Sequence, residues 1–161
     1  MTGVQTCALP ISVDSLRHYW SDLPEPKLIF QTPNAGHDLA GGKDATQTMA
    51  AFFQMIADHE ELPKVTWTRS AKEDVALEMS VSPAAKTFRL WTADSPDRDL
   101  RNDRWSSVEV PSNPGRKASA TIERPAQGYR AYLMEAEFAT KTGHTFKLST
   151  EARVLPDSSP K

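Results

Sequence analysis

The chain has 161 residues, a formal net charge of −2 and a single cysteine, Cys7. This near balance of charge, without a basic stripe, argues against nucleic acid or an anionic membrane as a main partner. No apolar run approaches the roughly 20 residues that a membrane span needs, so the sequence predicts a protein that is not membrane-spanning.

Residues 1–11 (MTGVQTCALPI) match the translation of a common short-read sequencing adapter. We therefore interpret them as an artefact and expect the natural sequence to begin near Ser12, in the middle of a domain, so that absences at this end are uninformative. Cys7 lies inside this stretch. The authentic part then has no cysteine and cannot use a disulfide, a cysteine nucleophile or a thiolate metal site.

The first predicted elements are a short helix, a strand and a loop. Asp14 is a favourable N-cap for a helix over residues 15–22, which the prolines at 24 and 26 end. Residues 27–31 (KLIFQ) are apolar at their centre, as expected for a strand buried in a sheet with helices on both faces. Residues 32–42 are rich in Pro, Asn, Gly and Asp, which indicates a loop.

A strong amphipathic helix follows, and Asp44 is placed to cap it. One strand and two helices cannot supply a core, so we expect residues 12–63 to be the C-terminal end of a larger α/β sheet whose earlier strands are missing. That loss would leave Phe30, Phe52 and Phe53 exposed, or covered only by the following domain. The helical spacing predicts one buried face, made of Ala45, Met49, Phe52, Phe53 and Ile56.

From Lys64 onward the hydrophobic period changes to two, which is typical of strands with one buried face. Turn signals separate the runs, so we predict an antiparallel, immunoglobulin-like β-sandwich of about seven strands over residues 64–155. Residues 156–161 have too little apolar content to pack and are expected to form a loose tail. The alternating runs are Val65 and Trp67; Val75, Leu77, Met79 and Val81; Phe88 and Leu90; Tyr132, Met134, Ala136 and Phe138; Phe146 and Leu148.

The candidate catalytic residue is His37, in the loop PNAGH at 33–37. A histidine after a buried strand and before a long helix occupies the position of the general base in a doubly wound hydrolase, where the triad order is Ser, Asp or Glu, then His. The alternative is a solvated histidine or one that stabilises the turn, and the spacing alone does not exclude it.

Several segments resemble the PhoPQ-activated pathogenicity-related family, which includes the autocrine proliferation repressor proteins. The similarity covers essentially all of residues 13–157 and spans both predicted parts in the right order. It implies an α/β-hydrolase-like catalytic domain followed by a C-terminal β-sandwich, in proteins that are usually exported. The segments are 19–23 (YWSDL), 33–39 (PNAGHDL), 51–53 (AFF), 89–91 (RLW), 126–129 (AQGY) and 151–157 (EARVLPD).

By this resemblance His37 would be the general base of a serine hydrolase acting on an ester or peptide bond. The chain contains no Gly-x-Ser-x-Gly, and the acid is expected a few residues before Val13, where the adapter-like stretch stands. Without a nucleophile and an orienting acid, this polypeptide is expected to be inactive. The alternative is a non-catalytic, hydrolase-like signalling or binding protein that uses the β-sandwich as its contact surface.

Other residues have structural interpretations that compete with functional ones. Asp14 could be the triad acid, but we favour the N-cap. Asp38 is expected to stabilise its turn. Trp67, Trp91 and Trp105 could form a face that stacks on sugars, but core or edge packing is favoured. We predict no metal site and no cofactor, because the other histidines, His18, His59 and His144, share no metal-ligand spacing.

Overall fold

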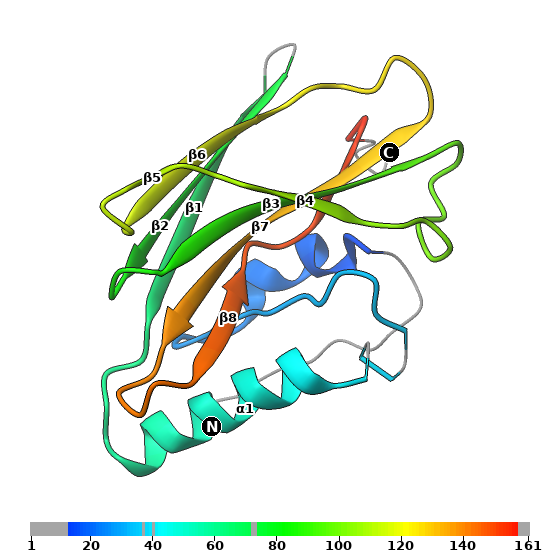
Figure 1. Ribbon diagram of the computed structural model, residues 1–161. Helices are drawn as coiled ribbons and strands as arrows, with labels where there is room; N and C mark the ends of the chain where they lie inside the picture. The colour runs from blue at the N-terminus through cyan, green and yellow to red at the C-terminus, as the bar shows by residue number, and fades with distance from the viewer. Residues whose placement is uncertain (1–12, 37, 40, 72–73, 158–161) are drawn as a thin grey trace.

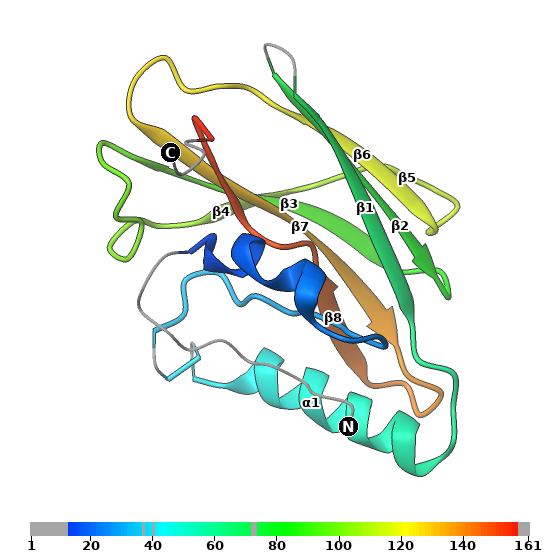
Figure 2. The same ribbon diagram turned by 180° about the vertical axis from the view of Figure 1, so that it is seen from behind.

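The computed structural model describes residues 13–36, 38–39, 41–71 and 74–157, and Figures 1 and 2 show it from two opposite sides. Most of the regular secondary structure in this part of the chain is antiparallel β-sheet. A single α-helix and two short 3-10 helices precede the strands. None of the described helices has both the length and the apolar character needed to cross a membrane.

The strands form two sheets, and each sheet joins segments that are distant in the sequence. The first has four strands in the order β1-β2-β6-β5, and the second has five, in the order β4-β3-β7-β8 with β9 also pairing with β7. All pairings are antiparallel. The bounds are β1 Lys64–Ala71, β2 Val75–Ser82, β3 Thr87–Ser95, β4 Ser106–Glu109, β5 Ser112–Asn113, β6 Lys117–Ile122, β7 Tyr129–Ala139, β8 Thr145–Ser149 and β9 Arg153–Leu155.

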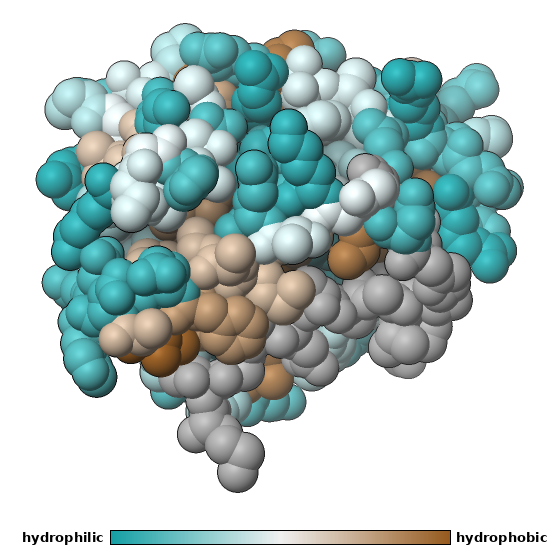
Figure 3. Space-filling view, turned by 60° about the horizontal axis from the view of Figure 1, so that its bottom comes forward, coloured by the Kyte–Doolittle hydropathy of each residue, from teal (hydrophilic) through white to brown (hydrophobic). Residues whose placement is uncertain are grey.

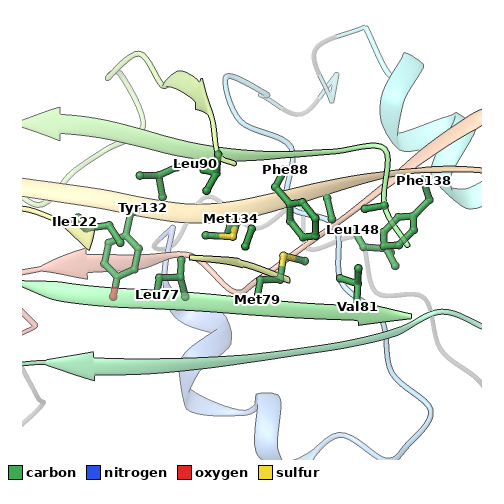
Figure 4. Close-up of a cluster of buried hydrophobic side chains, with 14 of the residues drawn as sticks. Leu77, Met79, Val81, Phe88, Leu90, Ile122, Tyr132, Met134, Phe138 and Leu148 are labelled. Carbon is green, nitrogen blue, oxygen red and sulfur yellow. The ribbon is translucent and has the colours of Figure 1, made fainter. Parts of the chain in front are cut away.

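The main hydrophobic core lies between the two sheets, as the period-two pattern predicts. In β2, Leu77 and Met79 are completely buried, and they face side chains of the second sheet such as Met134 (Figure 4). The rings of Phe138 and Phe146 stack with their centroids 5.1 Å apart. Each such side chain contributes roughly 1.5–3 kcal/mol when it leaves water.

All five alternating runs named from the sequence are strands, namely β1, β2, β3, β7 and β8. The remaining four were not identified individually. β4, β5 and β9 have only two to four residues, and β6 (KASATI) has alanine at two of its three inward positions, 118 and 120, before Ile122. Short strands and alanines give a weak hydrophobic alternation, which explains why the pattern missed them.

The segment before the sheets departs from prediction. The expected helix is two 3-10 helices, η1 (Ser15–His18) and η2 (Trp20–Asp22). The strand predicted at 27–31 is wrong, because these residues are extended but form no ladder. The Ser149 N–H at the end of β8 donates a hydrogen bond to the Ile29 carbonyl at 2.8 Å. Two residues earlier on the same edge, the N–H and carbonyl of Lys147 already bond to the Thr48 hydroxyl, so no ladder continues there.

Helix α1 (Lys43–Ala57) is found where it was predicted, but its cap and its buried face differ. Gly42, with a φ of 75°, is the N-cap, and Asp44 lies in the first turn without capping. Ala45 and Phe52 are buried as expected, whereas Phe53 is 60% exposed and Ile56 is 39% exposed. The helix is rotated so that Thr48, Ala51 and Met55 are buried instead.

The rotation of α1 has a physical cause in the edge of β8. The Thr48 hydroxyl accepts a hydrogen bond from the Lys147 N–H (3.1 Å) and donates one to the Lys147 carbonyl (3.3 Å). An uncovered strand edge would leave such groups free to pair with another chain. Satisfying them fixes which face of α1 turns inward, and Phe53 is left on the outside. The space-filling view from this side shows apolar surface there (Figure 3).

The segment before α1 and α1 itself lie on the side of the second sheet that faces away from the first sheet (Figures 1 and 2). Ala51 and Met55 of α1 nevertheless belong to the same core cluster as the strands. Of the phenylalanines expected to be exposed, Phe53 is exposed, Phe52 is buried and Phe30 is half-buried. The domain boundary near residue 63 stays a prediction.

Candidate functional site

The loop that carries His37 joins the extended segment to α1. His37 lies outside the described residues, but its neighbours are described. The Leu39 N–H donates to the Gly36 carbonyl (3.0 Å), and the Gly42 N–H donates to the Leu39 carbonyl (3.0 Å). The Asp38 carboxylate accepts from the Gly41 N–H at 3.3 Å, which confirms its predicted role in the turn. The described residues on either side of position 37 therefore form hydrogen-bonded turns.

Asn34 fixes the start of this loop to the sheet region. Its Oδ1 accepts a hydrogen bond from the Trp105 N–H (2.8 Å), and its Nδ2 donates one to the Trp105 carbonyl (3.0 Å). Asn34 has a φ of 58°, a left-handed conformation that asparagine tolerates better than most residues. Trp105 is buried in a second core cluster with Leu133 and Val154. The loop is thus anchored to a rigid base.

Lys147 of β8 fixes the other end of the loop. Its Nζ lies 2.7 Å from Asp44 Oδ2 in the first turn of α1 and 3.6 Å from Glu135 Oε1 of β7. Burial opposes the charge on Lys147, but the hydrogen bond with Asp44 and the charge of Glu135 outweigh it, so the pKa of Lys147 is raised. Together with the two hydrogen bonds of Thr48, this contact ties the start of α1 to β8.

Glu135 is the buried carboxylate beneath this contact, and it is only 3% exposed. Burial raises its pKa, and the positive charge of Lys147 offsets only part of that rise. The sequence does not distinguish it from Glu137, the other glutamate of β7 (YRAYLMEAEFA). The pairing of β7 with β8 brings Lys147 close to Glu135, and the packing of α1 against β8 brings Asp44 to Lys147.

Asp14 occupies the N-cap position of η1, as predicted, but its side chain does not act as the cap. Asp14 makes no side-chain capping bond and is 1% exposed. Its Oδ2 lies 2.7 Å from Arg98 Nη2 and 3.3 Å from Arg17 Nη1. Local sequence favours a cap, but a partner 84 positions away decides the outcome. A role for Asp14 as an acid beside His37 stays a prediction.

The Asp14 pair belongs to a longer chain of ion pairs that sequence reasoning missed. Arg17 contacts Asp157 at 2.7 Å, and Asp157 contacts Arg153 at 3.7 Å. The carboxylate of Glu151 then joins Arg153 (3.0 Å) and Arg69 (2.9 Å). The network connects η1, the C-terminal residues and β1. The residues of this network are far apart in the sequence, so no local charge pattern predicts it.

The three tryptophans do not form one aromatic face. Trp105 is buried in the second core cluster, Trp91 packs against that cluster, and Trp67 packs against the main core. Trp67 also meets the ring of Trp20 with 5.6 Å between centroids. Core and edge packing therefore accounts for them. In the described parts of the chain, no group of three His, Cys, Asp or Glu side chains is placed to hold a metal ion.

The fold and the loop define a class of protein: a β-rich chain with one α-helix and, before that helix, an anchored loop that contains a histidine. The chain belongs to the PhoPQ-activated pathogenicity-related family, whose sequence pattern matches residues 11–101.

A curated relative is the autocrine proliferation repressor protein A of Dictyostelium discoideum, which is 23% identical over 177 residues. That alignment covers 91% of this chain and 36% of the relative, so the chain spans about a third of the relative's length. No solved structure matches the chain.

Proposed function

We propose that the parent protein is a serine hydrolase that acts on an ester or peptide bond, with His37 as its general base. The observation that carries the proposal is the position of His37, in a turn-rich loop between an apolar extended segment and an amphipathic helix. Triad histidines of doubly wound hydrolases occupy this position. His37 would take the proton from the serine hydroxyl as the serine attacks the carbonyl carbon.

Each of the two predicted parts of the chain, residues 12–63 and 64–155, is also proposed to belong to a known fold. We propose that residues 12–63 are the end of an α/β-hydrolase-like domain, and the exposed Phe53 supports this because a missing sheet would cover it. We propose an immunoglobulin-like sandwich for residues 64–155. Its strand order, β1-β2-β6-β5 opposite β4-β3-β7-β8, corresponds to A-B-E-D opposite C′-C-F-G of that fold.

The 161-residue chain itself is expected to be inactive. It has no Gly-x-Ser-x-Gly elbow, and a histidine without a nucleophile has no hydroxyl to activate. A carboxylate that holds the imidazole in the correct tautomer is also required, and Asp14 is already paired with two arginines. The fluorophosphonate reactivity of this chain alone should therefore equal that of a heat-denatured sample.

The experiment that tests the proposal begins with the coding sequence before Ser12. Reading the gene across that junction should supply a serine elbow far upstream and an acid just before Val13. The parent protein should then hydrolyse a p-nitrophenyl ester and lose this activity when the elbow serine becomes alanine. A folded parent with no such serine, or with unchanged hydrolysis after its replacement, would contradict the proposal.

A second candidate function is a non-catalytic signalling or binding protein that keeps the hydrolase scaffold and uses the sandwich as its contact surface. The name of the Dictyostelium relative, a repressor of proliferation, favours this candidate because it describes signalling and not hydrolysis. Fold alone does not separate the two. A parent gene without an elbow serine would support signalling.

We also propose that the parent is exported, which the family's association with pathogenicity supports. Fractionation of cells that produce the parent should find it outside the cytoplasm. Recovery of the folded parent only from the cytoplasm would contradict export.

A further inference from the structure

The extended residues 27–31 lie beside the end of β8, and their backbone groups point to two different sides. On the β8 side, the Ile29 carbonyl accepts a hydrogen bond from the Ser149 N–H (2.8 Å), and the Gln31 N–H donates one to Ser149 Oγ (3.0 Å). In an extended chain, consecutive residues direct their N–H and carbonyl groups to opposite sides. The backbone groups of Leu28 and Phe30 therefore point away from β8.

The side that faces away from β8 is an open backbone edge. Within the described residues, the N–H and carbonyl groups of Leu28 and Phe30 form no backbone hydrogen bond. Both residues are half-buried, so this edge is reached from outside. Such a row of donors and acceptors is a template with which another extended segment can pair.

An apolar hollow lies beside this edge, between residues 28–30, α1 and β8. Its volume is about 480 Å³, which includes space open to solvent. The lining is apolar except for Thr48, whose hydroxyl already donates to and accepts from the backbone of Lys147. Little remains in the hollow to bind water, so an apolar side chain that enters it gains free energy. Its aromatic lining residues are Phe30, Phe52 and Phe146.

Helix α1 continues the apolar surface outward from the hollow. Met49, Phe53 and Ile56 are spaced by four and three residues, so they lie on one side of the helix. Met49 lines the hollow, whereas Phe53 is 60% exposed and Ile56 is 39% exposed. No charged residue belongs to the edge, the hollow or this stripe of α1. The whole surface therefore favours an uncharged, apolar partner with an extended backbone.

We propose that Leu28 and Phe30 form a docking edge, and that its occupant is an extended apolar segment of the parent protein from outside this chain. The segment pairs with the backbone groups of both residues, places an apolar side chain in the hollow and covers Phe53. The alignment with the Dictyostelium relative covers 36% of that protein, so a parent of similar length has ample chain to supply it. This inference rests on the proposed larger domain for its occupant, but not on the hydrolase reaction.

Amide hydrogen exchange, measured residue by residue with mass spectrometry, tests the pairing in this chain and in the parent. In this chain the Leu28 and Phe30 amides should exchange at close to the rate of an unfolded peptide, and the Gln31 amide more slowly because it is bonded to Ser149. In the folded parent, the Leu28 and Phe30 amides should exchange at least about a hundredfold more slowly. Equally fast exchange in the parent would overturn the proposal.

Slow exchange of the Leu28 and Phe30 amides in this chain alone would also overturn the proposal, because the edge would then be filled without the parent. Repeating the measurement over a range of protein concentrations identifies the occupant in that case. Slowing that increases with concentration would show that a second copy of this chain pairs with the edge. Slowing that is independent of concentration would show that the chain fills the edge itself.

A matched pair of charge variants on α1 tests the apolar contact. Phe53→Glu places a charge on the exposed stripe, and Gln47→Glu places the same charge on another exposed side of the helix. In this chain both variants should keep thermal midpoints within about 2 °C of wild type. In the parent, Phe53→Glu should lower the midpoint by about 5 °C or more, because it buries an unpaired charge, while Gln47→Glu should not. Equal midpoints of the two variants in the parent would overturn the docking.

Failure of the hydrolase function and failure of the docking edge give different results. A parent that does not react with a fluorophosphonate but protects the Leu28 and Phe30 amides would reject the hydrolase and keep the docking edge. A parent that reacts but leaves both amides unprotected would keep the hydrolase and reject the docking edge.

Discussion

Asp14 and Arg98 form a buried ion pair, with 2.7 Å between Oδ2 and Nη2, that joins the first described segment to the loop after β3. Asp14 is 1% exposed, and Arg17 shares its carboxylate. Because the carboxylate is inaccessible to water, its loss would leave two guanidinium groups without their buried counter-charge. This pair holds the segment before α1 against the strand region.

Asp14→Asn should therefore lower the free energy of unfolding by about 3 kcal/mol, at the lower end of the range for a broken buried pair because Arg98 is partly exposed. Urea denaturation followed by far-UV circular dichroism measures this change. Asp99→Asn, which breaks an exposed pair with Arg101, is the control and should change stability far less. Equal small effects would show that the buried pair does not hold the segment.

Phe52 and Phe53 offer a matched comparison on α1, because Phe52 is 8% exposed and Phe53 is 60% exposed. Phe52→Ala should lower the free energy of unfolding by about 3–5 kcal/mol through the lost burial and the cavity. Phe53→Ala should change it by no more than about 0.5 kcal/mol. Because it removes an exposed aromatic ring, Phe53→Ala should also remain monomeric up to a higher protein concentration than wild type in sedimentation experiments. The reverse order of stability would show that α1 is rotated differently.

Gly128 and Gly143 both have positive φ values, 70° and 87°, but differ in their surroundings. A Cβ at Gly128 would collide with the backbone carbonyl of Ser95, whereas a Cβ at Gly143 would meet nothing within 4 Å. Gly143→Ala should cost about 1–2 kcal/mol from backbone conformation alone. Gly128→Ala should cost more, and its thermal midpoint should be the lower of the two. Equal midpoints would mean that the turn before β7 adapts freely.

The raised pKa of Glu135 should make the free energy of unfolding depend on pH. Burial raises its pKa above the ordinary value of 4.5, so the folded protein binds this proton more tightly than the unfolded chain does. Its stabilising contribution is complete below that ordinary value and is lost as the pH rises through the folded-state value. Glu135→Gln mimics the neutral acid and should raise the thermal midpoint at pH 7.

Differential scanning fluorimetry between pH 4 and 8 checks the Glu135 prediction. The gain in Glu135→Gln should shrink as the pH falls, because the wild-type side chain becomes neutral as well. Lys147 keeps its contact with Asp44 in the variant. A variant that is less stable than wild type by the same amount at every pH would show that Glu135 acts as a charged partner of Lys147.

The sequence predicted the core strands well, because residues such as Leu77 and Phe138 repeat with a period that only a half-buried strand requires. The sequence pattern did not predict the pairings between polar groups that are distant along the chain. Asp14 has the local signature of a cap, and nothing near it indicates Arg98. The face of α1 was partly mistaken because hydrophobicity favours Phe53, while the hydrogen bonds of Thr48 with the β8 edge decide the rotation.

For the candidate site, the sequence predicted the position of the loop and the role of Asp38 in stabilising a turn. It did not find the Asn34 anchor, although asparagine is one of the residues that tolerate a left-handed turn conformation. The partner could not be inferred, since Trp105 lies 71 positions away. The role of His37 stays a prediction, because residue 37 lies outside the described residues.

The most direct measurement of the central claim is fluorophosphonate labelling of the intact parent, compared between wild type and His37→Ala by intact mass. One added phosphonyl group is expected in the wild-type protein and none in His37→Ala over the same time, while His59→Ala should be labelled like wild type. Equal labelling of a folded His37→Ala protein would contradict the role of His37 as the general base.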